Sequence, residues 1–498
     1  MEYILGIDIG TTGTKSALFS VDGTLVDKRY KPYSVVYPEQ GWAEQDPDDW
    51  WNALVDTVRV LISKNDASGK TIAMSLSTQG GCLVLLDKTF HPLYPAVSWM
   101  DTRAHETSGL LTRAITPEEL YRMCGWPVTE GLNFPTIFWF RQKREELFNQ
   151  THYFASTIDY LNYRLTGRFC IDYTNLALTG FLDLEKRDIC EKTVSIAGIT
   201  KKNIAQIIPS GEVIGRLTED TARILGLKKD VVVVSGAHDQ YCANMGTGAV
   251  NIGNCVLDAG TSWVLLAISD KLLFSKKKLS EDQGLFGLIF PGLHPASGKY
   301  GLMTVVPFGS NSLNWYRDTF NQGKTFEQLS QDACKVPCGS GGLLYIPIAS
   351  SGSGRGAFLG VDASYTMDYY TRAVFEGVAM ANKVHRTLIE DSGLRINSMT
   401  MIGGGARSSV WPQIVSDVLA MPVDLPEQSD AECAGAAVLA GVGVRVYDTI
   451  EDAVSRFSVK KKTVNPVKEN IVTYEKVLKS FIHYLGILYG CKITRNSP

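Results

Sequence analysis

Apolar residues along this chain follow two periods, one typical of β-strands and one typical of α-helices, which predicts a mixed α/β protein. The strand pattern opens the sequence: an apolar run ends at Asp8, a turn of glycine and threonine follows, and a second apolar run begins at Ser16. This arrangement predicts a β-hairpin. A further turn at Asp22-Gly23 extends it to a β-meander over about residues 1–40.

The helical period first appears after Asp46-Pro47, a pair typical of an N-cap followed by proline at the first helical position. Apolar residues then recur at i, i+4 spacing, which predicts an amphipathic helix. Within the mostly helical stretch 116–180, Gly167 is expected to end one helix as a C-cap. Further helices are predicted over 368–390, 411–419 and the small-residue stretch 434–440.

Three apolar runs predict strands that lead into polar or glycine-rich turns. They are 71–77 before Gln79, 231–235 before Gly236-Ala237-His238-Asp239, and 398–402 before a run of glycines. The run 231–235 is apolar almost throughout, as expected of a buried strand. The aspartate that follows it is a candidate catalytic base, with a helix N-cap as the alternative.

The opening motif occurs a second time. Asp8-x-Gly-Thr-Thr and Asp258-x-Gly-Thr-Ser each join two predicted strands by a polar turn, and each precedes a mixed α/β stretch. A repeated supersecondary unit predicts two domains of like fold. We place the boundary near residue 245, giving an N-terminal domain of residues 1–245 and a C-terminal domain of 246–498.

Composition narrows the class of protein. With 498 residues, 45% of them hydrophobic and 20% charged, the chain is expected to form more than one globular core. A formal charge of −3 gives no reason to expect nucleic acid or an acidic membrane as partner, and no apolar run approaches the roughly 18 residues of a membrane span. The 10 cysteines are scattered without CxxC spacing. We therefore expect a cytoplasmic protein with free thiols.

The turn of the first hairpin carries candidate chemistry. Its glycines and threonines offer backbone N–H groups and hydroxyls to an anion, and Asp8 stands at the end of the preceding strand. A carboxylate beside a phosphate group requires a cation between them, so the pattern indicates Mg²⁺. A structural hairpin that carries a surface aspartate remains the alternative.

Five motifs occur in order along the chain: the opening hairpin, Trp99-x-Asp101-x-Arg103, Gly236-x-x-Asp239, the second hairpin turn and Gly403-Gly404-Gly405-Ala406. Together they resemble the FGGY family of carbohydrate kinases over about residues 3–445, and residues 356–377 are similar to a further signature of that family. The resemblance implies an actin-like ATPase fold, in which two ribonuclease-H-like domains flank a cleft for nucleotide and sugar. It also implies ATP as phosphate donor, and a homodimer is compatible with it.

The resemblance further implies which residues handle ATP and the metal. Asp239 is expected to be the catalytic base, and Asp8 a second catalytic carboxylate that orients Mg²⁺; both are candidate metal ligands. The remaining candidates for ATP binding lie in the two hairpin turns and the glycine turn: Gly10, Thr11, Thr12, Lys15, Gly260, Thr261, Ser262, Gly404, Gly405, Ala406 and Ser408.

Sugar binding is expected from side chains that pair with vicinal hydroxyls or cover a carbon chain. The resemblance places these functions on residues of the N-terminal domain. They are Gln79, Trp99, Asp101, Arg103 and Gln240, next to Asp239.

The acceptor is expected to be a ketose or polyol, with the xylulokinase branch of the family as the best match. Glycerol, a tetritol, gluconate or another ketose are alternatives, and an actin-like or chaperone-like ATPase module is a more distant one. Xylulokinases usually carry Gln-Met-His-Gly where this chain has Gln79-Gly80-Gly81-Cys82. The two glycines predict either a larger pocket or a missing hydrogen bond, so we expect D-xylulose to be a usable but not a preferred substrate.

Overall fold

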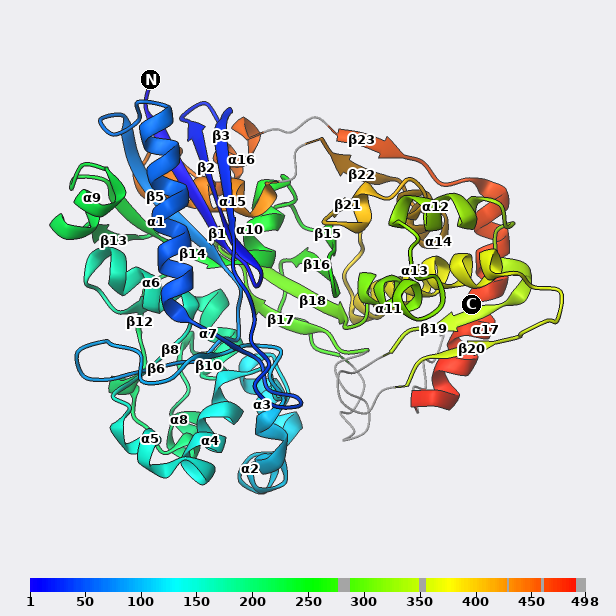
Figure 1. Ribbon diagram of the computed structural model, residues 1–498, viewed down its shortest axis with the longest axis horizontal. Coiled ribbons are helices and arrows are strands. Elements are labelled where there is room, and N and C mark those ends of the chain that lie inside the picture. The colour runs from blue at the N-terminus through cyan, green and yellow to red at the C-terminus, as the bar shows by residue number, and fades with distance from the viewer. Residues whose placement is uncertain (276–286, 349–354, 428–429, 458–460, 490–498) are drawn as a thin grey trace. The chain divides into compact units, whose positions relative to one another are not determined.

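The computed structural model describes residues 1–275, 287–348, 355–427, 430–457 and 461–489. The chain forms two compact units (Figure 1). Unit 1 comprises Met1–Val250, Gly292–Tyr300 and Asp430–Ser458, and unit 2 comprises Asn251–Pro291, Gly301–Ser429 and Val459–Pro498. The chain first passes from unit 1 to unit 2 after Val250, and the predicted boundary was near residue 245. Two later segments of the chain belong to unit 1 again.

A mixed sheet forms the centre of unit 1. In the described part of this unit, the strand order is β13-β14-β5-β1-β2-β3. Strand β1 runs antiparallel to β2 and parallel to β5, and β5 runs parallel to β14. The predicted meander is confirmed as β1 Tyr3–Ile9, β2 Gly13–Ser20 and β3 Leu25–Pro32, and the two later predicted strands as β5 Thr71–Thr78 and β14 Val232–His238. The sheet also contains β13 Val213–Arg216, which the sequence analysis did not predict.

The parallel strands of this sheet bring three predicted site segments to one edge. Asp8 on β1 is in register with Ser77 on β5, and Thr78 is in register with His238 on β14. Because the carboxyl ends of parallel strands meet at the same edge of a sheet, the residues after β1, β5 and β14 become neighbours.

Two helices pack closely at that edge. The predicted small-residue helix is α15 (Ala431–Gly443), which packs on β1 and on α10 (Asp239–Gly246). A Cβ atom at Gly6 would collide with the Cys433 carbonyl, and one at Gly435 with the Cys242 carbonyl. Glycine at these positions therefore allows backbone-to-backbone contact. This packing carries the N-terminal end of α15 to the first hairpin.

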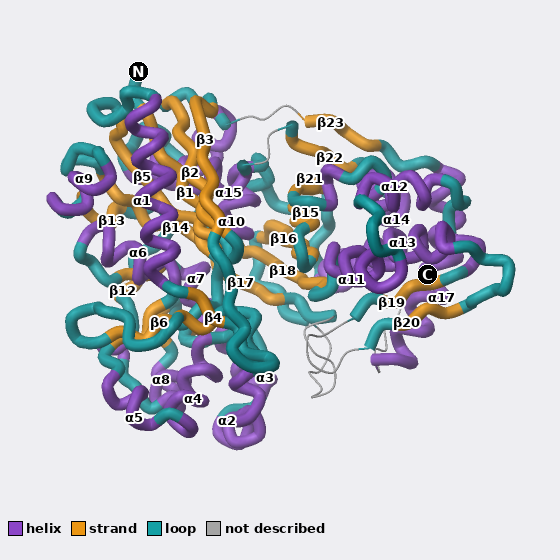
Figure 2. Tube along the Cα trace, viewed as in Figure 1, coloured by secondary structure: helices purple, strands orange, loops and turns teal. Residues whose placement is uncertain are grey.

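Helices and short strand pairs make up the rest of unit 1 (Figure 2). Helix α1 starts where the sequence predicts, with Asp46 as N-cap and Pro47 in the first turn, and Gly167 ends α6 with a φ of 73°. Their bounds, with those of the other elements, are α1 Pro47–Lys64, β4 Glu44–Gln45, β6 Val84–Leu86, β7 Ala96–Val97, η1 Arg103–Thr107, α2 Ser108–Ala114, α3 Pro117–Cys124, α4 Asn133–Lys143, α5 Glu145–Gln150, β8 Tyr153–Ala155, α6 Thr157–Thr166, β9 Cys170–Ile171, α7 Tyr173–Thr179, β10 Leu182–Asp183, β11 Asp188–Ile189, α8 Glu191–Ala197, η2 Lys201–Asn203, β12 Gln206–Ile207, α9 Glu219–Leu225 and α16 Ile450–Arg456.

Unit 2 repeats the hairpin arrangement of unit 1. Strands β15 and β16 form an antiparallel pair, and β15 runs parallel to β21, as β1 does to β5. The described strands follow the order β17-β18-β16-β15-β21-β22-β23. Their bounds are β15 Asn254–Ala259, β16 Trp263–Ser269, β17 Phe290–Leu293, β18 Tyr300–Val306, β21 Ser398–Ile402, β22 Val423–Pro426 and β23 Lys461–Val464.

A long buried helix, α13 (Met367–Ser392), lies in the core of unit 2 and contacts the C-terminal helix α17 (Lys468–Tyr489). The remaining elements are α11 Ser310–Phe320, α12 Phe326–Cys334, η3 Ser340–Gly342, β19 Leu344–Ile346, β20 Ala357–Leu359, η4 Gly405–Arg407 and α14 Trp411–Leu419. Within the described ranges, no helix is both long and apolar enough to cross a membrane.

A buried ionic cluster joins α13 to α17. Arg372 pairs with Glu376 (Nε to Oε1 2.7 Å), and the Tyr474 hydroxyl donates to the same carboxylate oxygen (2.8 Å). Arg372 and Glu376 belong to the stretch that resembles the further family signature. Their role in this fold is to hold the last helix against the core of unit 2, because a buried charge must be paired.

Candidate active site

The first hairpin turn is held in place by side chains around it. Tyr33 donates to the Gly10 carbonyl (2.6 Å), Tyr30 to the Thr12 carbonyl (3.0 Å) and Gln45 to the Thr11 carbonyl (2.9 Å). These bonds come from β3, from the segment after it and from β4, so the turn is fixed by chain segments distant in sequence. A turn fixed in this way is preorganised for a ligand.

Asp8 lies at the end of β1, beside this turn. Its Oδ1 accepts a hydrogen bond from Ser77 Oγ (2.8 Å). Burial and the nearby Glu432 carboxylate raise the pKa of Asp8 to about 8, against the effect of Lys15. Burial is the larger of the two effects, because it disfavours the charged form, and the like charge of Glu432 adds to it.

Asp239 is the first residue of α10, directly after β14. Its side chain is 27% exposed, and burial together with Glu432 raises its pKa to about 7 against hydrogen bonds from Gln240. A base whose pKa lies near the operating pH accepts a proton well and still exists largely in its basic form. The predicted base therefore has the electrostatic property that its role requires.

Two acidic residues of this site escaped the sequence analysis. Asp430 and Glu432 stand at the N-terminal end of α15, where Lys15 Nζ lies 3.7 Å from one carboxylate and 3.9 Å from the other. Burial opposes protonation of Lys15, but the Glu432 charge raises its pKa above the usual range. The sequence signal was the acidic pair directly before the small-residue helix; its proximity to β1 required the tertiary structure.

Two predicted sugar-binding side chains lie near the hairpin. Trp99 is 37% exposed, and its Nε1 donates to Thr11 Oγ1 (3.1 Å). Gln79 donates from Nε2 to Gln45 Oε1 (3.0 Å), while its own Oε1 is buried and has no hydrogen-bond partner among the described residues. A buried amide oxygen left without a partner is costly, which makes it a candidate acceptor for a ligand hydroxyl.

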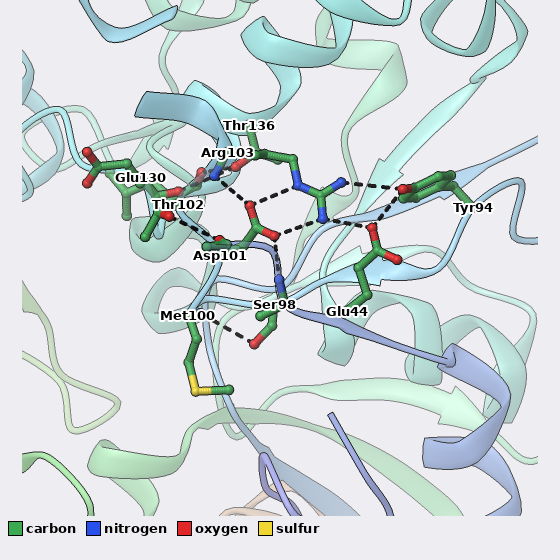
Figure 3. Close-up of polar contacts among 12 residues, drawn as sticks. Glu44, Tyr94, Ser98, Met100, Asp101, Thr102, Arg103, Glu130 and Thr136 are labelled. Carbon is green, nitrogen blue, oxygen red and sulfur yellow. Dashed lines mark hydrogen bonds and ion pairs between the residues drawn. The ribbon is translucent and has the colours of Figure 1, made fainter. Parts of the chain in front are cut away.

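Asp101 and Arg103, unlike Trp99, are buried and paired with each other. The Arg103 guanidinium donates to both Asp101 carboxylate oxygens (2.8 Å each) and to Glu44 Oε1 (2.7 Å), and it stacks 3.8 Å from the Trp42 ring (Figure 3 shows the polar contacts). Both side chains are at most 1% exposed. This network fixes the loop that carries Trp99. Direct contact of either side chain with a sugar stays a prediction.

The space beside Gly80 and Gly81 is filled by protein. A Cβ atom at Gly80 would collide with Leu178 and lie 2.9 Å from His238 Cδ2, and one at Gly81 would lie 2.6 Å from the Gly131 carbonyl oxygen. Gly81 also has a φ of 71°, which favours glycine. The two glycines thus leave no open volume at these positions, and the expectation of a larger pocket there is wrong; a missing hydrogen bond remains a prediction.

The other predicted nucleotide residues lie in unit 2, where two motifs meet. Gly403 and Gly405 pack against Ala259 at the end of β15, and a Cβ atom at Gly403 would lie 2.6 Å from Asp258 Oδ1. Gly404 and Ala406 belong to this same turn, and Gly260, Thr261 and Ser262 form the hairpin turn that follows β15. Ser408 Oγ lies 3.3 Å from Ser330 Oγ. The close backbone contact explains the glycines of the predicted adenosine turn.

A divalent cation fits the residues of unit 1. Among the described residues, no group of three or more His, Cys, Asp or Glu side chains is arranged to enclose a metal. Mg²⁺ does not require such a cage, because it is usually held by one or two carboxylates together with phosphate oxygens and water. Burial is the main cause of the raised pKa values of Asp8 and Asp239, and the Glu432 charge adds to it, so a cation beside these carboxylates would favour their ionised forms.

The hairpin that joins an aspartate to a glycine–threonine turn occurs in both units, as expected for an actin-like ATPase fold. The chain matches the family model "FGGY family of carbohydrate kinases, N-terminal domain" over residues 3–246 and the corresponding C-terminal domain over 255–444. It therefore belongs to the FGGY family of carbohydrate kinases. The chain is a sugar kinase, and this family uses ATP as phosphate donor.

Named relatives include xylulose kinases and gluconokinases. The chain is 27% identical over 483 residues to a xylulose kinase of Bacillus subtilis, covering 95% of each chain. It is also 27% identical over 505 residues to a gluconokinase of the same species, covering 98% of this chain and 96% of the relative. The crystal structure of a ligand-bound xylulose kinase from Lactobacillus acidophilus superimposes with a TM-score of 0.89 at 24% identity, covering 98% and 99% of the two chains. This likeness confirms the predicted fold.

Proposed function

We propose that this kinase phosphorylates a hydroxyl of a ketose or polyol and that Asp239 is the base of the reaction. One observation carries the proposal: Asp8 near the end of β1 and Asp239 directly after β14 lie at the same end of one sheet, on parallel strands separated only by β5, and the pKa of Asp239 is raised to about 7. A base of this strength suits the removal of a proton from an acceptor hydroxyl near neutral pH.

In the proposed mechanism, Gln79, Trp99 and Gln240 bind the acceptor. The Trp99 ring covers the carbon chain, and the unpartnered Gln79 Oε1 accepts a hydrogen bond from a hydroxyl. Asp239 then receives the proton of the attacking hydroxyl. Phosphoryl transfer depends mainly on such positioning and on charge neutralisation, rather than on covalent chemistry by the protein.

Lys15 and the turn Gly10-Thr11-Thr12 are the proposed contacts to the donor phosphates in unit 1. Lys15 lies beyond hydrogen-bond distance of Asp430 and Glu432, so a phosphate oxygen can attract it without breaking a tight pair. Asp8 and Asp239 would hold Mg²⁺, which neutralises the charge of the phosphates when bound. Hydroxyls of Thr11 and Thr12 add neutral donors beside that charge.

The acceptor itself is tested by an ADP-release assay coupled to NADH oxidation. The panel contains D- and L-pentuloses, hexuloses, glycerol, tetritols and gluconate, each measured at several concentrations. We expect sugar-stimulated ADP release with a ketose or polyol to exceed that with gluconate. Preference for gluconate by more than tenfold in kcat/KM would assign the chain to the gluconokinases. ATP hydrolysis that no compound stimulates would refute the proposal.

We further propose that the protein works in the cytoplasm, where ATP is available. Nine cysteines lie in the described ranges, and all nine are free, which fits a reducing compartment. A homodimer remains a proposal, and sedimentation of the purified protein tests it.

A further inference from the structure

In the loop after β5, Gly80 packs against the side chain of His238, the residue that precedes the proposed base. A Cβ atom at Gly80 would lie 2.9 Å from Cδ2 and 3.2 Å from Nε2 of His238. The imidazole thus takes the space that a side chain at position 80 would need. Contacts this close are shorter than ordinary packing distances, so the two positions cannot both carry full side chains without a shift.

Further contacts of His238 come from its backbone and from Tyr241. Residue His238 ends β14, and its backbone N–H donates to Thr174 Oγ1 (2.7 Å). Its ring lies 6.3 Å from the Tyr241 ring, measured between centroids. The side chain is 10% exposed, so the protein rather than solvent determines its orientation.

The ring faces the carboxylate of the proposed base. His238 Nε2 lies 3.0 Å from Asp239 Oδ1, although the geometry is not that of a good hydrogen bond. Oδ1 of Asp239 and Nδ1 of His238 have no hydrogen-bond partner within the described part of the chain.

We propose that His238 is a positioning residue for the Asp239 carboxylate, and that Gly80 is required because it leaves room for the imidazole. The ring fills the space beside Oδ1 and thereby limits rotation of the carboxylate. A side chain at position 80 pushes the ring toward the carboxylate and turns the base away from the acceptor. This inference rests on the proposed role of Asp239.

Leu178 offers a competing explanation for the glycine. A Cβ atom at Gly80 would also collide with Leu178 Cδ1, the end of a flexible side chain. If that collision alone mattered, Gly80 would serve packing and have no connection to catalysis. The two explanations predict different partners for a double-mutant cycle, because only residues that interact give non-additive effects.

The experiment measures kcat and KM for the best acceptor and for ATP in Gly80→Ala, His238→Ala and the double variant. We expect each single variant to lower kcat about tenfold, since a small misplacement of a reacting group has effects of this order or larger. KM for ATP should stay unchanged. In the His238→Ala background, Gly80→Ala should cost less than about twofold, a coupling typical of neighbouring residues.

Two further variants and two matched controls separate positioning from folding. His238→Gln, which keeps a side chain of similar length beside the Asp239 carboxylate, should keep most of the activity that His238→Ala loses. Gly80→Ala combined with Leu178→Ala should remain as slow as Gly80→Ala alone. The matched controls are Gly109→Ala, where an added Cβ meets nothing within 4 Å, and His91→Ala, on an exposed side chain. Both should behave like the unmodified protein in activity and in thermal melting.

Two results of the double variants would overturn the inference: multiplicative effects of Gly80→Ala and His238→Ala, or recovery of Gly80→Ala by Leu178→Ala. Failure of the proposed function is distinguishable, because the unmodified protein would then release no ADP in response to any sugar. A folding defect in Gly80→Ala is recognised from its melting curve. In that case the comparison of kcat between His238→Ala and His238→Gln tests the positioning role by itself. Equal kcat for those two and for the unmodified protein would refute the positioning role.

Discussion

Replacement of the proposed base by its amide, Asp239→Asn, is the most direct perturbation of this site. The substitution keeps the shape of the side chain at the start of α10 and removes its ability to accept a proton. General-base catalysis contributes about 10²- to 10⁴-fold, so we expect a loss of kcat in that range. ATP binding should remain near normal, since the residues proposed for the hairpin turn are unchanged.

The pKa of Asp239 gives the same prediction a second, quantitative form. With a pKa of about 7, only about 1% of this carboxyl is ionised at pH 5. The profile of kcat/KM, which reports the free enzyme, should therefore fall tenfold per pH unit below 7, and about a hundredfold by pH 5. If the base were an aspartate at its ordinary pKa of about 3.9, kcat/KM would fall by less than about a tenth between pH 7 and pH 5.

The assay is coupled ADP release with the best acceptor between pH 5 and 8.5, with both substrates below saturation and coupling enzymes in excess. Asp230→Asn, on an exposed side chain of the same unit, is the matched control and should leave both rate and profile unchanged. More than about a tenth of the activity retained by Asp239→Asn would refute the assignment of the base. A flat profile between pH 5.5 and 8 would show that the geometry does not raise this pKa.

Three further predictions concern charge and stability. In the apoprotein, the folded-state pKa of Asp8 is about 8, which is above its unfolded value. The contribution of Asp8 to stability is therefore greatest at low pH and is lost as the pH rises through 8. We expect Asp8→Asn to raise the melting temperature at pH 8.5, with a gain that shrinks toward pH 4. Asp8→Ala should weaken the Mg²⁺ dependence of the rate, and an unchanged Mg²⁺ titration would limit Asp8 to a structural role. Glu376→Ala leaves the buried Arg372 without its carboxylate and should cost about 3–5 kcal/mol in urea unfolding, whereas Tyr474→Phe should cost about 1 kcal/mol.

The sequence by itself determined the elements that depend on local patterns. The strands of both hairpins, the N-cap at Asp46, the C-cap at Gly167 and helix α14 were predictable because each is encoded by neighbouring residues. The repeat of the aspartate–glycine–threonine motif also predicted two related hairpins, which the structure confirms in β1–β2 and β15–β16. Motif order along the chain predicted the family.

Contacts between distant segments were decided only by the tertiary structure. Glu432 lies more than four hundred positions after Asp8 in the sequence, yet its charge raises the pKa of Asp8 and of Asp239. No local pattern encodes this pairing, because it depends on the glycine-mediated contact of α15 with β1. The division of the chain is decided in the same way, since Asp430–Ser458 returns to unit 1.

The burial and the neighbours of individual side chains could not be predicted from the sequence either. In the sequence, Trp99, Asp101 and Arg103 form one motif. In the folded chain Trp99 is 37% exposed, whereas Asp101 and Arg103 are buried in a network with Glu44. At Gly80 the sequence records only a missing side chain. Whether that absence opens a pocket or accommodates a neighbour depends on where Leu178 and His238 pack, and the fold fills the space with both. Composition specifies which groups are present, whereas burial and distance, which determine their chemistry, arise only when the chain is folded.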